Sequence, residues 1–177
     1  MHSLLSKLFL ILGLIFLVFA GFLLYQRYFS NPLTFKSTPQ VMHIRGDHLP
    51  YSLEIPSIHA NLPIIPALIQ GKTWETTTKG VSYLKTTPIP GEKGNSVIYG
   101  HNWKTILGDL TQVKPGQKII ITMNDGVKKE FIVEYTATVD PSQTYIIDNT
   151  KDTRITLYTC TGFLDSKRFV VVAFPTS

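Results

Sequence analysis

The sequence predicts an all-β domain, an eight-stranded β-barrel with one or two short helices, preceded by an N-terminal transmembrane helix. Beyond residue 50, short runs rich in Val, Ile, Thr and Tyr alternate with turn clusters, which is typical of antiparallel strands. The first 27 residues are dominated by a continuous apolar run, which is typical of a membrane-spanning helix. Many short strands with few helical turns between them favour closure into a barrel.

The N-terminal element is an uncharged apolar run from Leu8 to Tyr25, bounded by Lys7 and Arg27. A helical run of this length can span a bilayer. A cleavable signal peptide that ends near Ala20 is the alternative. Because the apolar run continues past Ala20, we expect an uncleaved membrane anchor over residues 1–27.

A polar stretch that contains Pro32, Pro39 and Gly46 follows the apolar run. It lacks periodicity and predicts a linker over residues 28–49. Residues 50–177 have the length of one folded domain with its own core. We therefore expect one folded domain over residues 50–177.

The chain has 17 Lys and Arg residues against 12 Asp and Glu residues. The charges are scattered and show neither a basic run nor the aromatic interleaving of nucleic-acid-binding proteins. The mild positive excess suits an ordinary solvated surface or an anionic wall or membrane. Nucleic acid is not an expected partner.

The expected strands are 51–55, 61–65, 73–77, 96–100, 117–123, 128–138, 154–160 and 168–174. The clearest hairpin turns at Asn124-Asp-Gly126, a sequence that tolerates the positive φ angles of tight turns. A short helix is expected between Trp103 and Val113, where Ile106, Leu107 and Leu110 share one face.

The single cysteine, Cys160, ends one expected strand, and Arg168 begins the next. Opposed residues in an antiparallel hairpin have a constant index sum, so pairing Cys160 with Arg168 also pairs Tyr158 with Val170 on the same face. Arg154 shares that face but lies roughly 20 Å away along the strand. Arg168 is therefore the arginine expected beside the sulfur.

A lone cysteine is either a reactive thiol or a buried and inert one. A reactive thiol needs a group that accepts and returns a proton, and the folded part offers His101 and His59. His101 directly follows an apolar run that ends at Gly100, where the missing side chain lets another group approach. We therefore favour His101. The other histidines fall in the membrane segment or the linker: His2, His43 and His48.

The segment Thr156-Leu-Tyr-Thr-Cys160, with Arg168 after it, resembles the Thr-Leu-x-Thr-Cys signature and arginine of the sortases. Sortases are membrane-anchored cysteine transpeptidases of bacterial surfaces. Pro90–His101 is similar to the segment that leads into the histidine of that family. Further segments resemble its first strand and its central connection: Leu53–Ile58, Leu107–Leu110 and Val113–Gly116.

The resemblance implies a sortase-type β-barrel with His101, Cys160 and Arg168 as catalytic residues. It implies that the sulfur attacks the threonine carbonyl of a sorting signal resembling Leu-Pro-x-Thr-Gly. A surface protein would then be held as a thioester until an amine of a peptidoglycan precursor or a pilin resolves it. The enzyme is expected in the plasma membrane as a single-pass protein with its catalytic domain on the extracellular face.

The chemistry of these side chains supports the same roles. The thiolate is the attacking form of cysteine, and a cation such as protonated His101 or Arg168 favours it. His101 can protonate the leaving amine near neutral pH. Arg168 keeps its proton and is suited to hydrogen bonding of an oxyanion. The expected substrate-binding residues are Thr159, Asn102 and Tyr158.

The loop after Cys160 is short, and Val139–Thr153 has no room for a long inserted helix. The sequence also stops at Ser177 and shows no evident lid before the domain. These features favour a housekeeping or specialised anchoring enzyme over the pilus-polymerising subgroup.

No cofactor is expected, because the nucleophile, the acid and the oxyanion donor are all protein groups. Some family members bind calcium through acidic loop residues, and the acids in the corresponding half are Glu130, Glu134, Asp140, Asp148 and Asp152. Scattered acids are more often solvated surface. Two other functions stay open: a non-catalytic cell-wall-binding β domain, and a peptidoglycan cysteine transpeptidase or hydrolase.

Overall fold

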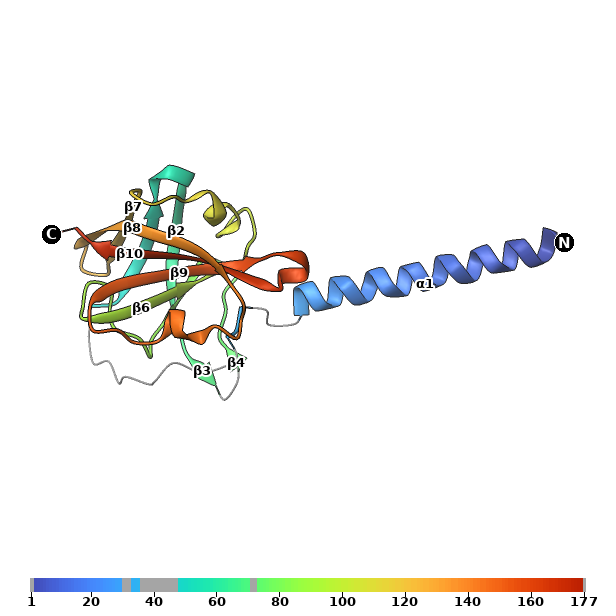
Figure 1. Ribbon diagram of the computed structural model, residues 1–177, viewed down its shortest axis with the longest axis horizontal. Helices are drawn as coiled ribbons and strands as arrows, with labels where there is room; N and C mark the ends of the chain where they lie inside the picture. The colour runs from blue at the N-terminus through green and yellow to red at the C-terminus, as the bar shows by residue number, and fades with distance from the viewer. Residues whose placement is uncertain (1, 30–32, 36–47, 71–72, 177) are drawn as a thin grey trace. The chain divides into compact units, whose positions relative to one another are not determined.

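The computed structural model describes residues 2–29, 33–35, 48–70 and 73–176. It divides into two compact units, Met1–Pro32 and Leu33–Ser177 (Figure 1). The first unit contains helix α1 (His2–Phe29). Within it, Leu5–Tyr25 is long and apolar enough to cross a membrane, with 21 residues and a mean hydropathy of 2.8. The expected N-terminal apolar helix is therefore present.

The second unit is built on a closed barrel whose strands follow the order β1-β2-β5-β6-β9-β10-β8-β7, with β7 paired back to β1. The expected eight-stranded barrel is confirmed within the described residues. The barrel strands are β1 (Pro50–Ile55), β2 (Ala60–Ala67), β5 (Val81–Leu84), β6 (Gly94–Tyr99), β7 (Lys118–Met123), β8 (Lys128–Val139), β9 (Thr153–Thr161) and β10 (Lys167–Pro175).

One expected barrel strand was wrong. Of the expected strand 73–77, only β4 (Thr73–Trp74) forms, and it pairs with β3 (Ile69–Gln70) in a separate two-stranded sheet. The barrel position is filled by β5, whose residues are all buried. A strand buried on both faces shows no alternation of polar and apolar residues, so the pattern of Val81–Leu84 gave no signal.

The expectation of an antiparallel domain was also incomplete. β2 pairs with β5 in parallel, and β6 pairs with β9 in parallel, while the other barrel pairs are antiparallel. Parallel neighbours need a long connection, and here the residues between β6 and β9 supply one that contains β7 and β8.

Short 3-10 helices join the strands, four of them in the described part of the chain instead of the expected one or two. They are η1 (Pro56–Ile58), η2 (Gly108–Gln112), η3 (Thr144–Ile147) and η4 (Phe163–Asp165). Within the segment from Trp103 to Val113, where a helix was expected, only the 3-10 helix η2 forms. Ile106, Leu107 and Leu110 are nevertheless buried, as their spacing predicted.

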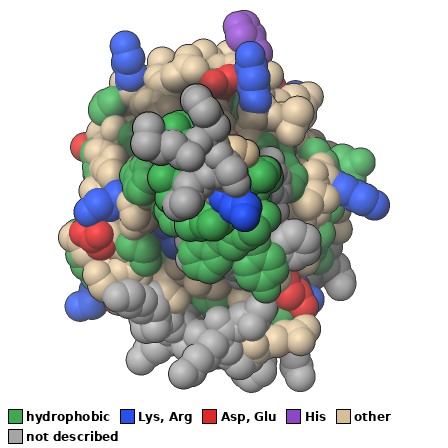
Figure 2. All heavy atoms as spheres, turned by 90° about the vertical axis from the view of Figure 1, so that its right-hand side faces the viewer, with side chains coloured by type: hydrophobic (Ala, Val, Ile, Leu, Met, Phe, Trp, Pro, Cys, Tyr) green, Lys and Arg blue, Asp and Glu red, His purple; other side chains and the backbone are tan. Residues whose placement is uncertain are grey.

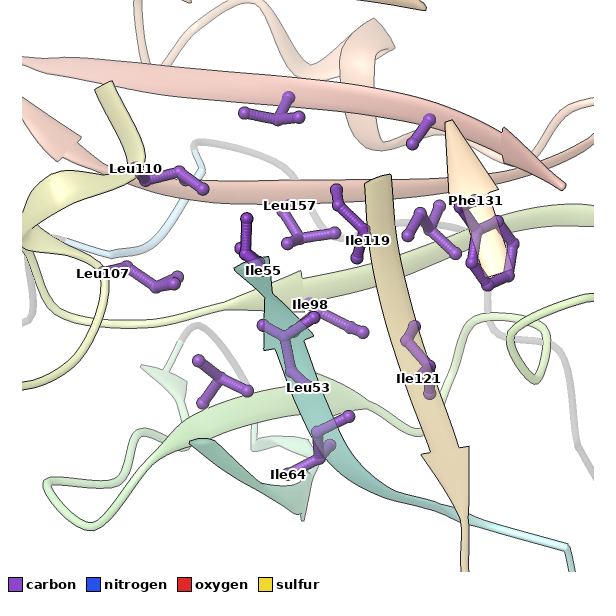
Figure 3. Close-up of a cluster of buried hydrophobic side chains, with 14 of the residues drawn as sticks. Leu53, Ile55, Ile64, Ile98, Leu107, Leu110, Ile119, Ile121, Phe131 and Leu157 are labelled. Carbon is purple, nitrogen blue, oxygen red and sulfur yellow. The ribbon is translucent and has the colours of Figure 1, made fainter. Parts of the chain in front are cut away.

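The barrel interior is an apolar core in which side chains from opposite strands meet. Figure 3 shows Leu53 of β1, Ile98 of β6, Ile121 of β7 and Leu157 of β9 pointing into the same space. Each of these four side chains has no exposed surface. Burying one such side chain stabilises the fold by roughly 2 kcal/mol, so this core holds β6 and β9 firmly in place.

Strand β9 is buried on both faces, and this positions the cysteine. Ile155 and Leu157 point into the barrel core, whereas Tyr158 and Cys160 belong to a second apolar cluster. Side chains alternate across a strand, so this second cluster lies on the outer face of the sheet. We call the outward-facing residues Tyr99 of β6, Tyr158 and Cys160 of β9, and Val170 of β10 the cysteine face.

Leu33 and Phe35 pack into the cluster on the cysteine face, with exposed fractions of 0% and 4%. They lie in the range 28–49 that the sequence predicted as a linker. The folded unit therefore begins before residue 50 and includes Leu33–Phe35. His43 and most of the predicted linker lie outside the described residues.

Charged side chains are distributed over the surface. On the face seen in Figure 2, the Lys and Arg side chains are scattered, and several of them lie next to an Asp or Glu side chain. Most charged residues of the described barrel are exposed or half-buried, whereas Arg168 is buried, with an exposed fraction of 3%. A buried arginine is costly unless its donors are satisfied, which directs attention to its surroundings.

Candidate active site

Cys160 and Arg168 are direct partners across the antiparallel pair β9–β10, as the sequence predicted. Tyr158 pairs with Val170 in the same register. Both Cys160 and Arg168 have exposed fractions of 3%. The parity argument thus placed the guanidinium and the sulfur beside each other on one face.

His101 comes to the cysteine through the parallel pair β6–β9. Tyr99 pairs with Tyr158, so two residues further along each chain His101 is level with Cys160. Two hydrogen bonds extend this alignment beyond β6: Gly100 N–H donates to the Tyr158 carbonyl (3.2 Å), and the Thr159 hydroxyl donates to the Gly100 carbonyl (2.8 Å). Gly100 is therefore held next to β9, and the charge of Asp165 acts on both His101 and Cys160, so the imidazole and the thiol lie around the same carboxylate.

Gly100 has no side chain, and this allows the connection that follows the histidine to pack closely against it. A Cβ atom at Gly100 would lie 3.0 Å from a methyl of Ile106 and 3.2 Å from one of Leu107. Both of these side chains are buried in the connection that follows the histidine. The missing side chain therefore lets that connection fold tightly against the end of β6.

The imidazole of His101 stacks on the indole of Trp103, with ring centroids 4.5 Å apart and an angle of 12° between the planes. The Leu107 N–H donates to the His101 carbonyl (3.0 Å) and fixes the backbone. Partial burial lowers the pKa of His101 below its ordinary value, and the negative charge of Asp165 partly opposes this shift. The imidazole is thus mainly neutral at neutral pH.

Burial raises the pKa of the Cys160 thiol to about 12. The positive charge of Arg168 acts in the opposite direction, and the charge of Asp165 adds to the rise. The resting site therefore holds a neutral thiol and a neutral imidazole. The nucleophilic thiolate is a minor form until the surroundings of the sulfur change.

Three backbone carbonyls receive hydrogen bonds from Arg168. Nη1 donates to the carbonyls of Asp165 and Lys167, both at 2.9 Å, and Nη2 donates to the carbonyl of Thr34 at 3.0 Å. These bonds offset the cost of burying the charge and fix the plane of the guanidinium. Arg168 already binds one peptide carbonyl that comes from outside the β9–β10 hairpin.

Asp165 belongs to the site, although no sequence pattern singled it out. Its Oδ1 accepts a hydrogen bond from Asn102 Nδ2 (2.8 Å), and its charge reaches both His101 and Cys160. It has a positive φ of 59° in the turn between β9 and β10. Its place within the short loop between Cys160 and Arg168 was the one available signal.

The residues expected to bind substrate are near the cysteine, but their polar groups are engaged within the chain. The Tyr158 hydroxyl donates to the carbonyl of Leu33 (2.9 Å), and the Thr159 hydroxyl donates to Gly100. Asn102 donates to Asp165. In this arrangement Thr159 and Asn102 position the site, and their binding of substrate stays a prediction.

The other candidate histidine in the folded part lies elsewhere. His59 caps η1 in the turn between β1 and β2, with a positive φ of 52°. It lines a cavity of about 180 Å³ together with Lys104 and Asp109. None of the residues that line this cavity is Cys160 or Arg168. The structure therefore pairs Cys160 with Arg168 and groups Cys160 and His101 around Asp165, whereas His59 lines a cavity to which none of the three contributes.

Among the described residues, no cluster of three or more His, Cys, Asp or Glu side chains is suited to a metal ion. Three of the acids considered for calcium form ion pairs instead. Glu130 pairs with Lys118 and Asp140 with Lys167, both at 2.8 Å, and Asp152 pairs with Arg154. The donor set in this part of the chain does not fit a calcium site.

Comparison with known proteins supports the resemblance seen in the sequence. A family model described as the sortase domain matches residues 53–176. The chain is 34% identical over 125 residues to sortase A of Listeria monocytogenes, which covers 68% of this chain and 54% of that protein. The chain spans about half the length of the curated relatives it matches.

Solved structures agree with the fold. The crystal structure of Listeria monocytogenes sortase A superimposes with a TM-score of 0.59 and 31% identity, covering 75% of this chain and 89% of that chain. Sortase C from Clostridium perfringens gives a TM-score of 0.60 at 26% identity, covering 76% and 72%. The matched family model, the barrel order and these likenesses lead to one conclusion: the chain belongs to the sortase family.

Proposed function

We propose that this chain is a cysteine transpeptidase that cleaves a sorting signal resembling Leu-Pro-x-Thr-Gly and transfers the surface protein to an amine. The observation that carries the proposal is the pairing of Cys160 with Arg168, and it is supported by Asp165, whose charge acts on both Cys160 and His101. Family membership favours this activity over a non-catalytic wall-binding domain and over a peptidoglycan transpeptidase or hydrolase.

Acylation begins with a neutral thiol and a neutral imidazole. The Cys160 proton passes to His101 as the sulfur bonds to the threonine carbonyl carbon of the signal. The carbonyl oxygen becomes an oxyanion, and Arg168 donates a hydrogen bond to it. The carbon–nitrogen bond then breaks, and the proton on His101 goes to the departing amine. A thioester on Cys160 and a neutral imidazole are the products.

Deacylation runs the same steps with a new amine. The incoming amine attacks the thioester carbonyl and gives a proton to His101, and Arg168 again stabilises the oxyanion. The carbon–sulfur bond breaks, and the proton on His101 returns to the sulfur. We propose an amine of a peptidoglycan precursor or a pilin as the acceptor, which leaves the protein joined by a new amide bond.

Helix α1 supports a placement at the plasma membrane, because it contains one segment suited to span it. We propose that α1 anchors the enzyme as a single-pass protein with the catalytic unit on the extracellular face. The sorting-signal-bearing proteins would be presented at the same surface. Anchoring the enzyme there raises the local concentration of both partners.

Within the family we propose an anchoring enzyme rather than a pilus-polymerising one. The connection between β8 and β9 holds only the short helix η3 (Thr144–Ile147). Its tip is fixed by Asn95, whose Nδ2 donates to the carbonyls of Ile146 and Asp148, both at 3.1 Å. A connection this short, with its tip held by hydrogen bonds, leaves little space for an inserted helix between β8 and β9.

Intact mass spectrometry tests the activity. The full chain in detergent micelles is incubated with sorting peptides, and a covalent adduct with the mass of the acyl fragment is expected on the wild type. Cys160→Ala should give no adduct while it keeps the fold. An adduct on the Cys160→Ala protein would show that another residue is the nucleophile.

The same assay tests the choice of histidine. His101→Ala should reduce turnover by about 10²–10⁴-fold, the usual contribution of a general acid–base group. His59→Ala is the matched control, because the cavity that His59 lines does not include Cys160. A severe loss in His59→Ala with normal turnover in His101→Ala would reverse the assignment.

A further inference from the structure

The imidazole of His101 has an aromatic neighbour that the reaction proposed above does not use. Its ring stacks on the Trp103 indole, with centroids 4.5 Å apart and 12° between the planes. In the part of the chain that the structure describes, no hydrogen bond to either ring nitrogen accompanies this contact. A catalytic histidine is usually oriented by a hydrogen bond to a third group. Here the stack is the contact that fixes the plane of the ring.

Trp103 is held in place by the turn that follows it. Its carbonyl accepts hydrogen bonds from the N–H groups of Ile106 and Gly108, both at 2.8 Å. A Cβ atom at Gly108 would lie 2.8 Å from the Trp103 carbonyl carbon, so a larger residue there would displace the backbone of Trp103. The indole is partly buried and packs against the barrel core. A residue held through both its backbone and its ring gives the imidazole a fixed surface.

The face of an indole attracts cations, because the π electrons concentrate negative charge there. Among aromatic side chains, tryptophan attracts a cation most strongly. The proposed reaction makes His101 an imidazolium twice, once in each half of the cycle. Partial burial disfavours this charged form. The stacked indole therefore favours the form of His101 that burial disfavours.

Charged side chains of the neighbouring elements act unequally on the imidazole. Asp165, in the turn between β9 and β10, is the charged group that raises the pKa of His101. Other ionisable side chains of β9, β10 and the connection after His101 do not contribute to this shift, among them Cys160, Arg168, Lys104 and Asp109. Within the described site, Asp165 and Trp103 are thus the two groups that favour the imidazolium.

We propose that Trp103 is a positioning residue for His101: it fixes the plane of the imidazole and stabilises the imidazolium that forms when Cys160 gives up its proton. The assignment rests on the proposed function for the reaction in which the imidazolium takes part. The stack and the hydrogen bonds of the turn carry it. A flexible aliphatic side chain at position 103 would still cover part of the ring but would do neither.

Trp103→Leu tests this role, because leucine keeps an apolar cover over the imidazole and removes the π face. NMR titration of the full chain in detergent micelles follows the His101 imidazole, whose signal is assigned by its absence in His101→Gln. In Trp103→Leu the pKa of His101 should be lower by about half to one and a half pH units, the usual range of a cation–π contact. The value of kcat/KM for a sorting peptide should fall by about tenfold or more, mainly through kcat.

Trp103→Phe keeps an aromatic face, so kcat/KM should stay within about threefold of the wild type and the pKa of His101 should be intermediate. Tyr51→Leu is the matched control. Tyr51 is an aromatic residue of β1 with an exposed fraction of 65%, and its replacement should change neither the pKa of His101 nor kcat/KM. An unchanged or raised pKa of His101 in folded Trp103→Leu would overturn the proposal, as would equal losses of kcat/KM in the Phe and Leu variants.

Fluorescence gives a second reading. A protonated imidazole in contact with indole quenches the indole fluorescence, so the emission of the wild type should fall as the pH drops through the pKa of His101. The other tryptophan, Trp74, belongs to the cluster on the cysteine face and is present in every variant. The pH-dependent part of the emission should disappear in His101→Gln and in Trp103→Leu. Emission that does not change with pH in the wild type would contradict the stack.

The titrations need no sorting peptide, so they decide the role of Trp103 even if no acyl-enzyme forms. If thermal melting shows that Trp103→Leu is unfolded, Trp103→Phe carries the test, and a pKa of His101 equal to or above that of the wild type overturns the proposal. Normal turnover with an unchanged pKa in Trp103→Leu would count against the positioning role alone. The expected pKa shift without any adduct in the wild type would count against the transpeptidase activity alone.

Discussion

The Arg168 side chain is buried, and its guanidinium donates hydrogen bonds to three backbone carbonyls that hold it in position. Arg168→Lys should lower kcat/KM by about 10²–10³-fold, the cost of losing one oxyanion donor, because an ammonium lacks the planar fork. Steady-state cleavage of a fluorogenic sorting peptide measures the loss. Near-normal activity would mean that only the positive charge matters.

Asp165 gives a prediction about ionisation. Its negative charge raises the pKa of both Cys160 and His101, so Asp165→Asn should lower both. More thiolate is then present at neutral pH, and alkylation of Cys160 should be about two- to tenfold faster. Asparagine keeps the oxygen that accepts from Asn102.

The alkylation rate of Cys160 is measured in the wild type and in Asp165→Asn at several pH values, with about pH 7 to 9 chosen as the experimental range. The rate should rise with pH in each, because the thiol is neutral throughout this range. Asp109→Asn is the control, since the Asp109 carboxylate accepts a hydrogen bond from Gln112 and is not among the groups that shift either pKa. A slower reaction in Asp165→Asn would show that the carboxylate supports the thiolate instead.

Between elements, the β6–β9 pair decides whether His101 reaches the cysteine. The Thr159 hydroxyl bonds the Gly100 carbonyl next to His101, whereas the Thr156 hydroxyl bonds Asn95 Oδ1 (2.7 Å) further along the same strand. Both threonines are fully buried. They form a matched pair for testing alignment.

Thr159→Val and Thr156→Val should each lower the free energy of unfolding by about 1–3 kcal/mol, because each leaves a buried acceptor without its donor. Thr159→Val should also lower kcat/KM by about tenfold or more, since small displacements of a catalytic group are costly. Thr156→Val should leave kcat/KM within about threefold. Urea unfolding and peptide cleavage measure the two effects, and equal activity losses would contradict the alignment role.

Local patterns predicted elements well where one face of a strand is buried and the other exposed. The hairpin of β7 and β8 turns where it was expected to, and the hairpin of β9 and β10 has the expected register, because a one-residue shift would expose the apolar face. β5 escaped notice because it is buried on both faces and has only four residues. Its placement depends on β2 and β6, which flank it in the barrel.

For the whole molecule, burial of the cysteine links ionisation to stability. The folded thiol has a pKa of about 12 against an ordinary value of 9.0. Above pH 9.0 the unfolded chain loses this proton while the folded chain keeps it, so the free energy of unfolding should fall as pH rises toward 12. The slope from this group is at most about 1.4 kcal/mol per pH unit.

Urea unfolding at pH 8, 9 and 10, chosen as experimental conditions, measures this effect, and Cys160→Ala should show a shallower decline. Buried tyrosines such as Tyr83 and Tyr99 also have raised pKa values, but their ordinary value is 10.0, so they contribute above that pH. Identical declines in the wild type and in Cys160→Ala would show that the thiol ionises as easily in the folded state as in the unfolded one.

Composition, short-range alternation and strand parity were enough to predict the apolar helix, most barrel strands and the pairing of Cys160 with Arg168. The sequence also selected His101 through the apolar run and the glycine before it. The tertiary structure alone decided the parallel β6–β9 register, the inclusion of Asp165, and the cover formed by Leu33–Phe35. Those features join residues far apart in the chain, and their energies depend on surfaces that exist only once the barrel has closed.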